Sequence, residues 1–332
     1  MTTGLLLVLN YTSNEESFDS VQYLILERTY GYFVRILHFN GAAFIFIILY
    51  LHLFKALFYG SYRLSKVWRV GIILLVLMIA TAFSGYVLLY SQMSYWAAMV
   101  IINFFRTIPI LGNNLVLLIF GRFIVSRSTL KLLFIVHFLV PFLILLIVVV
   151  HLYFLHEHGR SSSLSLVNDD SKIYFYPRYA MKDSINLVFL LVGWILILIY
   201  PFNLGDPEIF IEKEQMMRPV HIIPEFYFLF AYAILRAIPN KRLGLILLVL
   251  AILSLFLLAI NRKYRYKLPS SLLCWHKILV FLFIRVGLVL TFLGKALVEI
   301  PFITLSLFFT ILYFLTLFSI LFIRFILDCS LS

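Results

Sequence analysis

The chain has 332 residues, of which 63% are hydrophobic and only 13% charged, and its mean hydropathy is +1.04. Soluble globular chains are about half apolar and a quarter charged, so this composition argues against a water-soluble enzyme, a nucleic-acid-binding domain and a disordered protein. The net charge of +12 is typical, in a membrane protein, of orientation signals and of contact with anionic headgroups. The two cysteines, Cys274 and Cys329, have no CxxC spacing and predict neither a disulfide framework nor a zinc or iron–sulfur site.

Several apolar segments are long enough to cross a bilayer, which takes roughly 20 apolar residues per helix. We expect seven such helices, near residues 31–58, 67–90, 128–155, 183–201, 243–260, 273–293 and 302–327. The first ten residues resemble the end of one more helix, too short to span alone, and lack the basic region and cleavage site of a signal peptide. The predicted fold class is therefore all-α, a polytopic bundle of transmembrane helices.

The connections between these segments alternate in their content of basic residues. Three of them hold 12 Lys or Arg in 54 residues, namely 59–69, 156–182 and 262–277. The other four hold 10 in 105 residues, namely 12–30, 91–127, 202–242 and 294–301. Because basic loops stay on the negative (N) side of an energised membrane, the second group is expected on the positive (P) side.

Two of the P-side connections contain apolar stretches that are too short or too interrupted to span. They are SYWAAMVIINFF in 91–127 and EFYFLFAYAIL in 202–242. Such stretches are typical of amphipathic helices that lie on the surface and cover a site.

Four of the eight histidines lie inside apolar segments, in two pairs of equal spacing. His38 and His52 are 14 residues apart, as are His137 and His151. Four α-helical turns are 14.4 residues, so both members of a pair point the same way, about 21 Å apart along the axis. The two segments run parallel, because one helix separates them. The pattern therefore predicts two facing histidine pairs at two depths, which would suit two haems with bis-histidine ligation. Buried histidines bonded across helices are the plainer interpretation of any one of them.

Neighbouring residues fit the same interpretation. Gly71 and Gly85 are also 14 residues apart and would let a flat macrocycle approach the helix between the ligand helices; Gly4 could add a further close contact. Arg35 and Lys55 lie three residues from His38 and His52 and could pair with haem propionates, although basic side chains near helix ends also snorkel to the interface.

These residues resemble those of mitochondrial cytochrome b, the core subunit of ubiquinol–cytochrome c reductase (respiratory complex III). The resemblance covers almost the whole chain. It includes RILHFNGAAFIFIILYLHLFKALFYGSY (35–62), SGYVLLYSQMSYWAA (84–98), HFLVPF to HLYFLHEHG (137–159), IIPEFYFLFAYAILRAIPNK (222–241) and VEIPFI (298–303). The chain is continuous and its second histidine spacing is 14, which fits the respiratory form better than the split chloroplast relative with a spacing of 15.

The resemblance implies a role for each of these positions. His38 and His137 would ligate a low-potential haem b on the P side, and His52 and His151 a high-potential haem b on the N side. The motif PEFY, Pro224 to Tyr227, corresponds to the family's PEWY at the site of quinol oxidation. There Glu225 would accept a proton from quinol, in a pocket that the resemblance also lines with Tyr86, Ala97 and Tyr232.

On the N side, the resemblance implies a quinone-reduction site with His156 and Asp183, next to Lys182. His156 and Asp183 would hydrogen-bond the two quinone carbonyls and relay protons. Taken locally, Asp183 is equally an N-cap or first-turn carboxylate, because Lys182–Asp183 is expected to open its helix, and His156 a solvated loop residue. His158, His221 and His276 have no comparable role, although His221 borders the P-side pocket.

The resemblance also implies an organisation and a setting. Residues 1–201 would form the haem-binding bundle and 202–332 the C-terminal helices with the PEFY loop. The cofactors would be two b haems, with ubiquinol and ubiquinone as substrates, in the mitochondrial inner membrane. Partners would be a c-type cytochrome subunit, a Rieske iron–sulfur protein, a second copy of the chain and lipids such as cardiolipin, and no nucleic acid.

The sequence departs from the family at several points. The family's first helix begins some forty residues earlier, so the N-side quinone site is the less secure expectation. Leu89-Tyr90-Ser91 replaces the family's Pro-Trp-Gly, and Ala97 replaces a pocket glycine. Three alternatives stay open at this point: a transporter or channel with proton-relaying histidines, a haem b membrane anchor of another quinone oxidoreductase, and a structural remnant without the chemistry.

Overall fold

The computed structural model describes residues 1–158, 173–260 and 274–330. Within these ranges, seven helices are long and apolar enough to cross a membrane, which confirms the predicted all-helical membrane bundle. They are α3 (Gly31–Phe58), α4 (Ser65–Leu88), α7 (Arg127–His158), α8 (Arg178–Ile199), α10 (Lys241–Leu253, continued by the 3₁₀ segment η5, Ser254–Ala259), α11 (Cys274–Lys295) and α12 (Phe302–Ser330).

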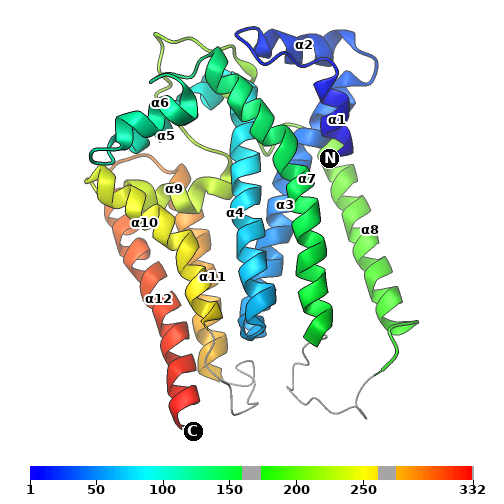
Figure 1. The fold of residues 1–332 in the computed structure, drawn as a ribbon, viewed down its shortest axis with the longest axis vertical. Coiled ribbons are helices and arrows are strands. Elements are labelled where there is room, and N and C mark those ends of the chain that lie inside the picture. Colours follow the sequence, from blue (N-terminus) through cyan, green and yellow to red (C-terminus); the bar gives the residue numbers. More distant parts are fainter. Residues whose placement is uncertain (159–172, 261–273, 331–332) are drawn as a thin grey trace.

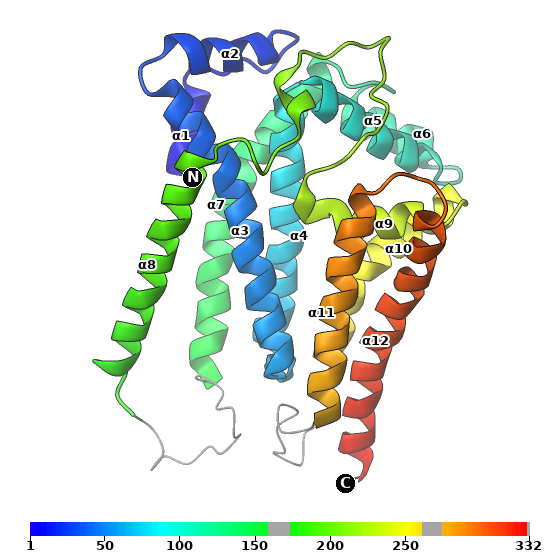
Figure 2. The same ribbon diagram turned by 180° about the vertical axis from the view of Figure 1, so that it is seen from behind.

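The shorter helices gather at one end of this bundle (Figures 1 and 2). They are α1 (Thr2–Val8), α2 (Ser17–Glu27), α5 (Gln92–Arg106), α6 (Gly112–Phe120) and α9 (Leu229–Arg236), with the 3₁₀ segments η3 (Pro207–Phe210) and η4 (Phe226–Phe228). The two apolar stretches expected as surface helices are thus α5 and η4–α9. The tight turn η1 (Ser61–Arg63) lies at the opposite end. This grouping agrees with the predicted sorting of the connections, of which 159–172 and 261–273 lie outside the described residues.

The turn between α3 and α4 depends on one glycine. Gly60 follows α3 with φ 64°, a left-handed conformation that only glycine adopts without steric cost. Its carbonyl accepts the backbone N–H of Arg63 at 3.2 Å, which closes the turn. Helix α4 therefore returns antiparallel to α3, and α7 runs parallel to α3, as the histidine argument requires.

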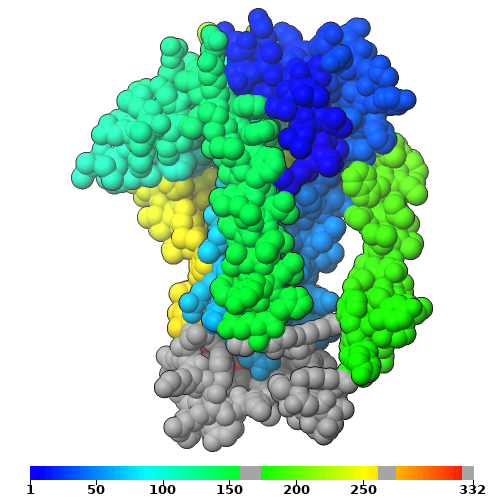
Figure 3. Space-filling model, turned by 45° about the vertical axis from the view of Figure 1, so that its right-hand side comes forward, coloured from blue at the N-terminus to red at the C-terminus, as the bar shows by residue number. Residues whose placement is uncertain are grey.

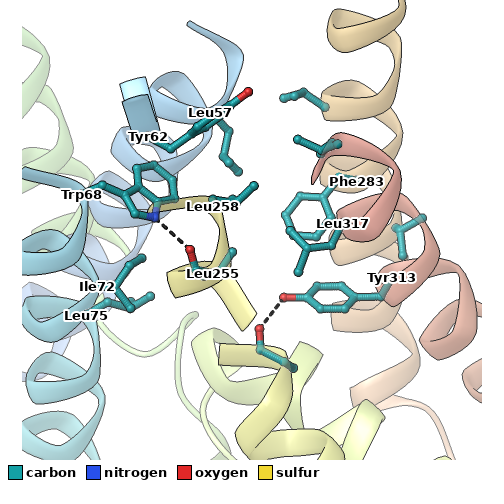
Figure 4. Packing of buried hydrophobic residues seen from close by; sticks show 14 of the residues in the cluster. Leu57, Tyr62, Trp68, Ile72, Leu75, Leu255, Leu258, Phe283, Tyr313 and Leu317 are labelled. Carbon is teal, nitrogen blue, oxygen red and sulfur yellow. Dashed lines mark hydrogen bonds between the residues drawn. The ribbon is translucent and has the colours of Figure 1, made fainter. Parts of the chain in front are cut away.

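The largest hydrophobic core joins the first helices of the chain to the last ones (Figure 4). It includes Leu57, Ile72 and Leu75 from α3 and α4, and Phe283 and Leu317 from α11 and α12. Two side chains in it also make hydrogen bonds to the backbone of the segment α10–η5. Trp68 donates to the carbonyl of Leu255 at 2.9 Å, and Tyr313 to that of Ala251 at 3.0 Å.

Side chains from other helices bond to backbone carbonyls where α10 changes to a 3₁₀ helix at Ser254. An unpaired carbonyl is costly where water is excluded. The carbonyls of Ala251, Leu255 and Ala259 accept hydrogen bonds from Tyr313, Trp68 and Arg69, respectively, which stabilise this segment.

Helix α8 lies apart from the other spanning helices along most of its length (Figures 1 and 3). Almost all its side chains are exposed, and its close contact with α3 is at Gly193, where an added Cβ would lie 2.4 Å from the Phe44 ring. It begins at Arg178 with Pro177 at the N-cap position. The expectation that Lys182–Asp183 opens this helix is therefore wrong, because the polar segment 178–182 already forms its first turn.

Candidate functional site

Helices α3 and α7 bring the four histidines together in two pairs at two depths. The imidazole centroids of His38 and His137 are 6.1 Å apart, with ring planes at 86°. Those of His52 and His151 are 6.4 Å apart, with planes at 68°. The pairing is the one that equal spacing on parallel helices predicts.

Both separations fit one metal ion between two imidazoles. A metal–imidazole nitrogen bond is about 2 Å long, and the ring centroid lies about 1.2 Å further on, so two rings on opposite sides of an ion have centroids about 6.3 Å apart. Among the described residues, no group of three or more His, Cys, Asp and Glu side chains could hold a metal ion. With two histidines as the protein ligands, the other ligands of the metal must come from a cofactor, such as the four ring nitrogens of a haem.

Three glycines make room beside these imidazoles. A Cβ added to Gly85 would lie 2.3 Å from Cε1 of His137. One added to Gly71 would lie 3.2 Å from Cε1 of His151, and one added to Gly4 would lie 3.1 Å from Cε1 of His38. Each glycine therefore faces one candidate ligand. At Gly85, any larger residue would displace the imidazole of His137.

The Nδ1 atoms of the two P-side histidines have hydrogen-bond partners that the sequence analysis missed. Nδ1 of His38 lies 3.1 Å from the hydroxyl of Thr3, and Nδ1 of His137 lies 2.8 Å from the carbonyl of Thr81. A carbonyl only accepts, so Nδ1 of His137 carries the proton and Nε2 keeps a free lone pair for a metal. The partner of His137 is a backbone carbonyl, which no residue type in the sequence indicates. The partner of His38 is the side chain of Thr3, and its position next to Gly4 could have suggested this contact.

The two cations near the ligands differ in their surroundings. The guanidinium of Arg35 lies 5.3 Å from the centroid of the Phe39 ring, on the same helix, and is partly buried. Lys55 lies near the opposite end of α3 and is exposed. Arg35 also interacts electrostatically with Glu225, which connects the P-side histidine pair to the second part of the site.

The PEFY motif lies between the surface helices and the bundle. Glu225 is 8% exposed, and its Oε1 atom is buried with no hydrogen-bond partner among the described residues. Burial, together with the nearby carboxylate of Asp206, raises the pKa of Glu225 to about 7, while Arg35 opposes this shift. A buried carboxyl with a pKa near neutrality is suited to exchange protons.

The loop that precedes Glu225 is held by two side chains. The sulfur of Met93 accepts the backbone N–H of Ile223 at 3.4 Å, and the hydroxyl of Tyr232 donates to the carbonyl of Ile222 at 3.1 Å. Ile222 and Met93 belong to a small core that also contains Ala97, with Tyr86 packed against it. The structure thus places Tyr86, Ala97 and Tyr232 around the residues that lead to Glu225.

Tyr227 is placed differently from the other tyrosines. It is 5% exposed, and its ring stacks on Phe46 of α3 with centroids 4.2 Å apart. The hydroxyl of Tyr50 donates to its backbone carbonyl at 2.6 Å. Tyr227 therefore packs the PEFY segment, which starts at the half-buried Pro224, against α3, the helix that carries His38 and His52.

The expected N-side residues are not brought into mutual contact. His156, Lys182 and Asp183 are all exposed, and within the part of the chain that is described none of them makes a side-chain hydrogen bond or ion pair. The ion pair at this end is instead Lys66–Glu157, at 2.8 Å between α4 and α7. His276, to which the sequence analysis assigned no role, is 1% exposed, and its Nε2 atom lies 3.1 Å from the hydroxyl of Tyr62.

Comparisons with known proteins agree with this geometry. Residues 1–159 match the family model "Cytochrome b/b6/petB", and residues 212–314 match "Cytochrome b(C-terminal)/b6/petD". Cytochrome b of Caenorhabditis briggsae is 50% identical over 315 residues, 95% of this chain and 84% of the relative. Cytochrome b of Caenorhabditis elegans is 49% identical over 322 residues, 97% of this chain and 86% of the relative.

A solved structure is also similar. A chain of a hyperthermophilic respiratory complex III superimposes with a TM-score of 0.89 and 28% sequence identity, over 98% of this chain and 87% of that one. The fold, the paired histidines and the sequence identity of about 50% over nearly the whole chain therefore point to the same family. The chain belongs to the cytochrome b family, as the resemblance indicated, and binds haem b as a multi-pass membrane protein.

Proposed function

We propose that this cytochrome b is the catalytic subunit of a ubiquinol–cytochrome c reductase. It oxidises quinol at the P-side site, carries electrons across the membrane through two b haems, and reduces quinone on the N side. The complex III neighbour and the curated relatives support this function. The observation that carries it is the two imidazole pairs, at 6.1 and 6.4 Å, four helical turns apart.

The four histidines hold the haems. His38 and His137 would hold the P-side iron and His52 and His151 the N-side iron, with Gly4, Gly71 and Gly85 leaving room beside the imidazoles. Arg35 and Lys55 would pair with propionates towards the two ends of α3. When bound, the two haems supply one-electron transfer in two short steps in place of one long step across the hydrocarbon core.

On the P side, Glu225 takes a proton from the quinol hydroxyl. Within the described part of the chain its buried Oε1 has no hydrogen-bond partner, so a substrate hydroxyl can donate to it. Pro224, Tyr227 and the tyrosines 86 and 232 shape the pocket with Ala97. Asp206 acts on Glu225 electrostatically and favours its protonated form.

On the N side, His156 and Asp183 hydrogen-bond the quinone carbonyls, with Lys182 beside them. Their exposure to solvent suits residues that collect protons from the aqueous phase. Proton uptake here and release on the P side couple the reaction to proton translocation. Moving one charge across the membrane against the potential costs about 2.3 kcal/mol per 100 mV. A higher reduction potential of the N-side haem than of the P-side haem offsets part of this cost.

The function requires further components. A Rieske iron–sulfur protein accepts one electron from each quinol and a c-type cytochrome passes it on. The chain works as a homodimer, with lipids such as cardiolipin around it, in the mitochondrial inner membrane. Residues 1–201 form the haem bundle and 202–332 the helices that carry the PEFY loop.

Turnover of the purified complex tests this function. We expect reduction of cytochrome c by ubiquinol, and reduction of the b haems by quinol in the same preparation. A transporter would carry no haem. A haem b anchor of another oxidoreductase would contain haem that quinol reduces, with no reduction of cytochrome c, and that outcome would contradict the proposal.

A further inference from the structure

Among the described residues, one side chain makes a hydrogen bond to Nδ1 of a P-side histidine. The hydroxyl of Thr3 on α1 lies 3.1 Å from Nδ1 of His38 on α3. The next residue, Gly4, faces the same imidazole at its Cε1 atom. Helix α1 therefore contacts this ring twice, once through an oxygen and once through a bare Cα.

The direction of this hydrogen bond follows from the bond to iron. A histidine that binds iron through Nε2 carries its proton on Nδ1, so Nδ1 donates and the oxygen of Thr3 accepts. The opposite ligand has the same arrangement, with Nδ1 of His137 donating to the carbonyl of Thr81 at 2.8 Å. Both histidines that would hold the P-side haem thus have an acceptor at Nδ1.

An acceptor at Nδ1 makes an imidazole more basic and a stronger electron donor to the metal. Stronger donation stabilises ferric over ferrous iron, which lowers the reduction potential. We propose that Thr3 is a positioning residue whose hydroxyl lowers the potential of the P-side haem. This inference rests on the proposed function, because it requires a haem bound by His38.

Thr3 differs from the other acceptor, the carbonyl of Thr81, because a substitution can remove it. The partner of His137 is a main-chain carbonyl, which no substitution at residue 81 removes. The partner of His38 is a side chain at a half-buried position on a short helix. The potential of one haem can therefore be adjusted at residue 3 without rebuilding α3, α4 or α7.

The test is a redox titration of both b haems in the purified complex of three variants. Thr3→Val keeps the shape and removes the acceptor, and Thr3→Ser keeps the acceptor. Thr2→Val is the matched control, because residue 2 is an exposed threonine of the same helix. We expect Thr3→Val to favour the ferrous form of the lower-potential haem up to about tenfold, a rise of up to 59 mV. The other haem, Thr3→Ser and Thr2→Val should titrate like the wild type.

Three results would overturn the inference: an unchanged lower potential in Thr3→Val, an equal shift in both haems, or the same shift in Thr2→Val. If Thr3→Val fails to assemble, Thr3→Ala serves as the second variant without an acceptor. Absence of b haems from the wild-type complex would contradict the proposed function itself, which is a different and separately visible outcome.

Discussion

At Glu225, burial and two neighbouring charges act on one carboxyl, and one of the charges opposes the other two effects. Burial and Asp206 favour its neutral form, whereas Arg35 favours its anion, and the balance raises its pKa to about 7. A base must be deprotonated to accept a proton. A proton acceptor with this pKa is therefore neutral and inactive in acid, and becomes competent as the pH rises through about 7.

The first prediction concerns Glu225→Gln. We expect quinol oxidation to fall about 10²-fold, the usual size of a general-base contribution, and to lose the increase in rate between about pH 6 and 8. Steady-state rates across this range check both effects. The exposed carboxylate of Glu214, in the same connection, gives the control Glu214→Gln, and equal losses in the two variants would contradict the assignment.

The second prediction uses Asp206→Asn. Its negative charge raises the pKa of Glu225, so removing it lowers that pKa, and the half-maximal rate moves to a lower pH. Asparagine keeps the side-chain oxygen that accepts the N–H of Glu208 at 2.9 Å, which preserves the local turn. A profile that stays in place or moves to higher pH would show that Asp206 does not act on the proton acceptor.

The third prediction concerns Ala97, which is 8% exposed and packs in the core beside Ile222. Its methyl group narrows the P-side pocket, so strobilurin-type inhibitors should bind this protein more weakly than its Ala97→Gly variant. Inhibition constants for quinol oxidation in the two proteins measure the difference. Equal constants would mean that the methyl group does not border the inhibitor.

Among the helices, α4 approaches both histidine pairs through glycines. Gly71 and Gly85 face His151 and His137, and they leave α4 without side chains at the two depths of the ligand pairs. The same helix carries Trp68 on another face, where it joins the core to η5. One helix thus serves the site and the packing with different faces.

The fourth prediction follows from the closest of these contacts. Gly85→Ala puts a Cβ about 2.3 Å from Cε1 of His137, so the imidazole must move away from the position in which it faces His38. We expect loss of the lower-potential b haem with the other retained, measured as haem per chain and by redox titration. Gly41→Ala on α3 is the control, since nothing lies within 4 Å of the added atom. Full haem content in Gly85→Ala would contradict the expected crowding.

The helices could be predicted from hydropathy because a membrane leaves a chain few other structures. The predicted segments match the seven spanning helices to within a few residues at most ends. The start of α8 was missed because Arg178 and Lys182 make its first turns polar. The 3₁₀ segment from Ser254 could not be predicted either, since it depends on donors from Trp68 and Tyr313 on distant helices.

The candidate site was predictable where its residues follow a helical period. The spacing of 14 residues was enough to predict that His38 faces His137 and His52 faces His151. Contacts between segments that are unrelated in sequence were not predictable. The carbonyl of Thr81 behind His137 and the support of the PEFY loop by Met93 both arise from tertiary packing.

Across the whole molecule, the PEFY segment and the two histidine pairs follow one another from one end of the bundle to the other. The PEFY segment and the His38–His137 pair lie towards the end with the surface helices, and His52–His151 lies towards the opposite end, with His156 beyond it. The large core connects α3 and α4, which border the histidine pairs, to α11 and α12 near the end of the chain.

The central claim is that this chain holds two b haems, one between each histidine pair. A redox-titrated optical spectrum of the purified complex, with haem assayed per chain, tests it most directly. We expect two b haems per cytochrome b chain that titrate as separate one-electron components at different potentials. A single b haem per chain, or none, would contradict the claim and leave at least one histidine pair as a polar contact between helices.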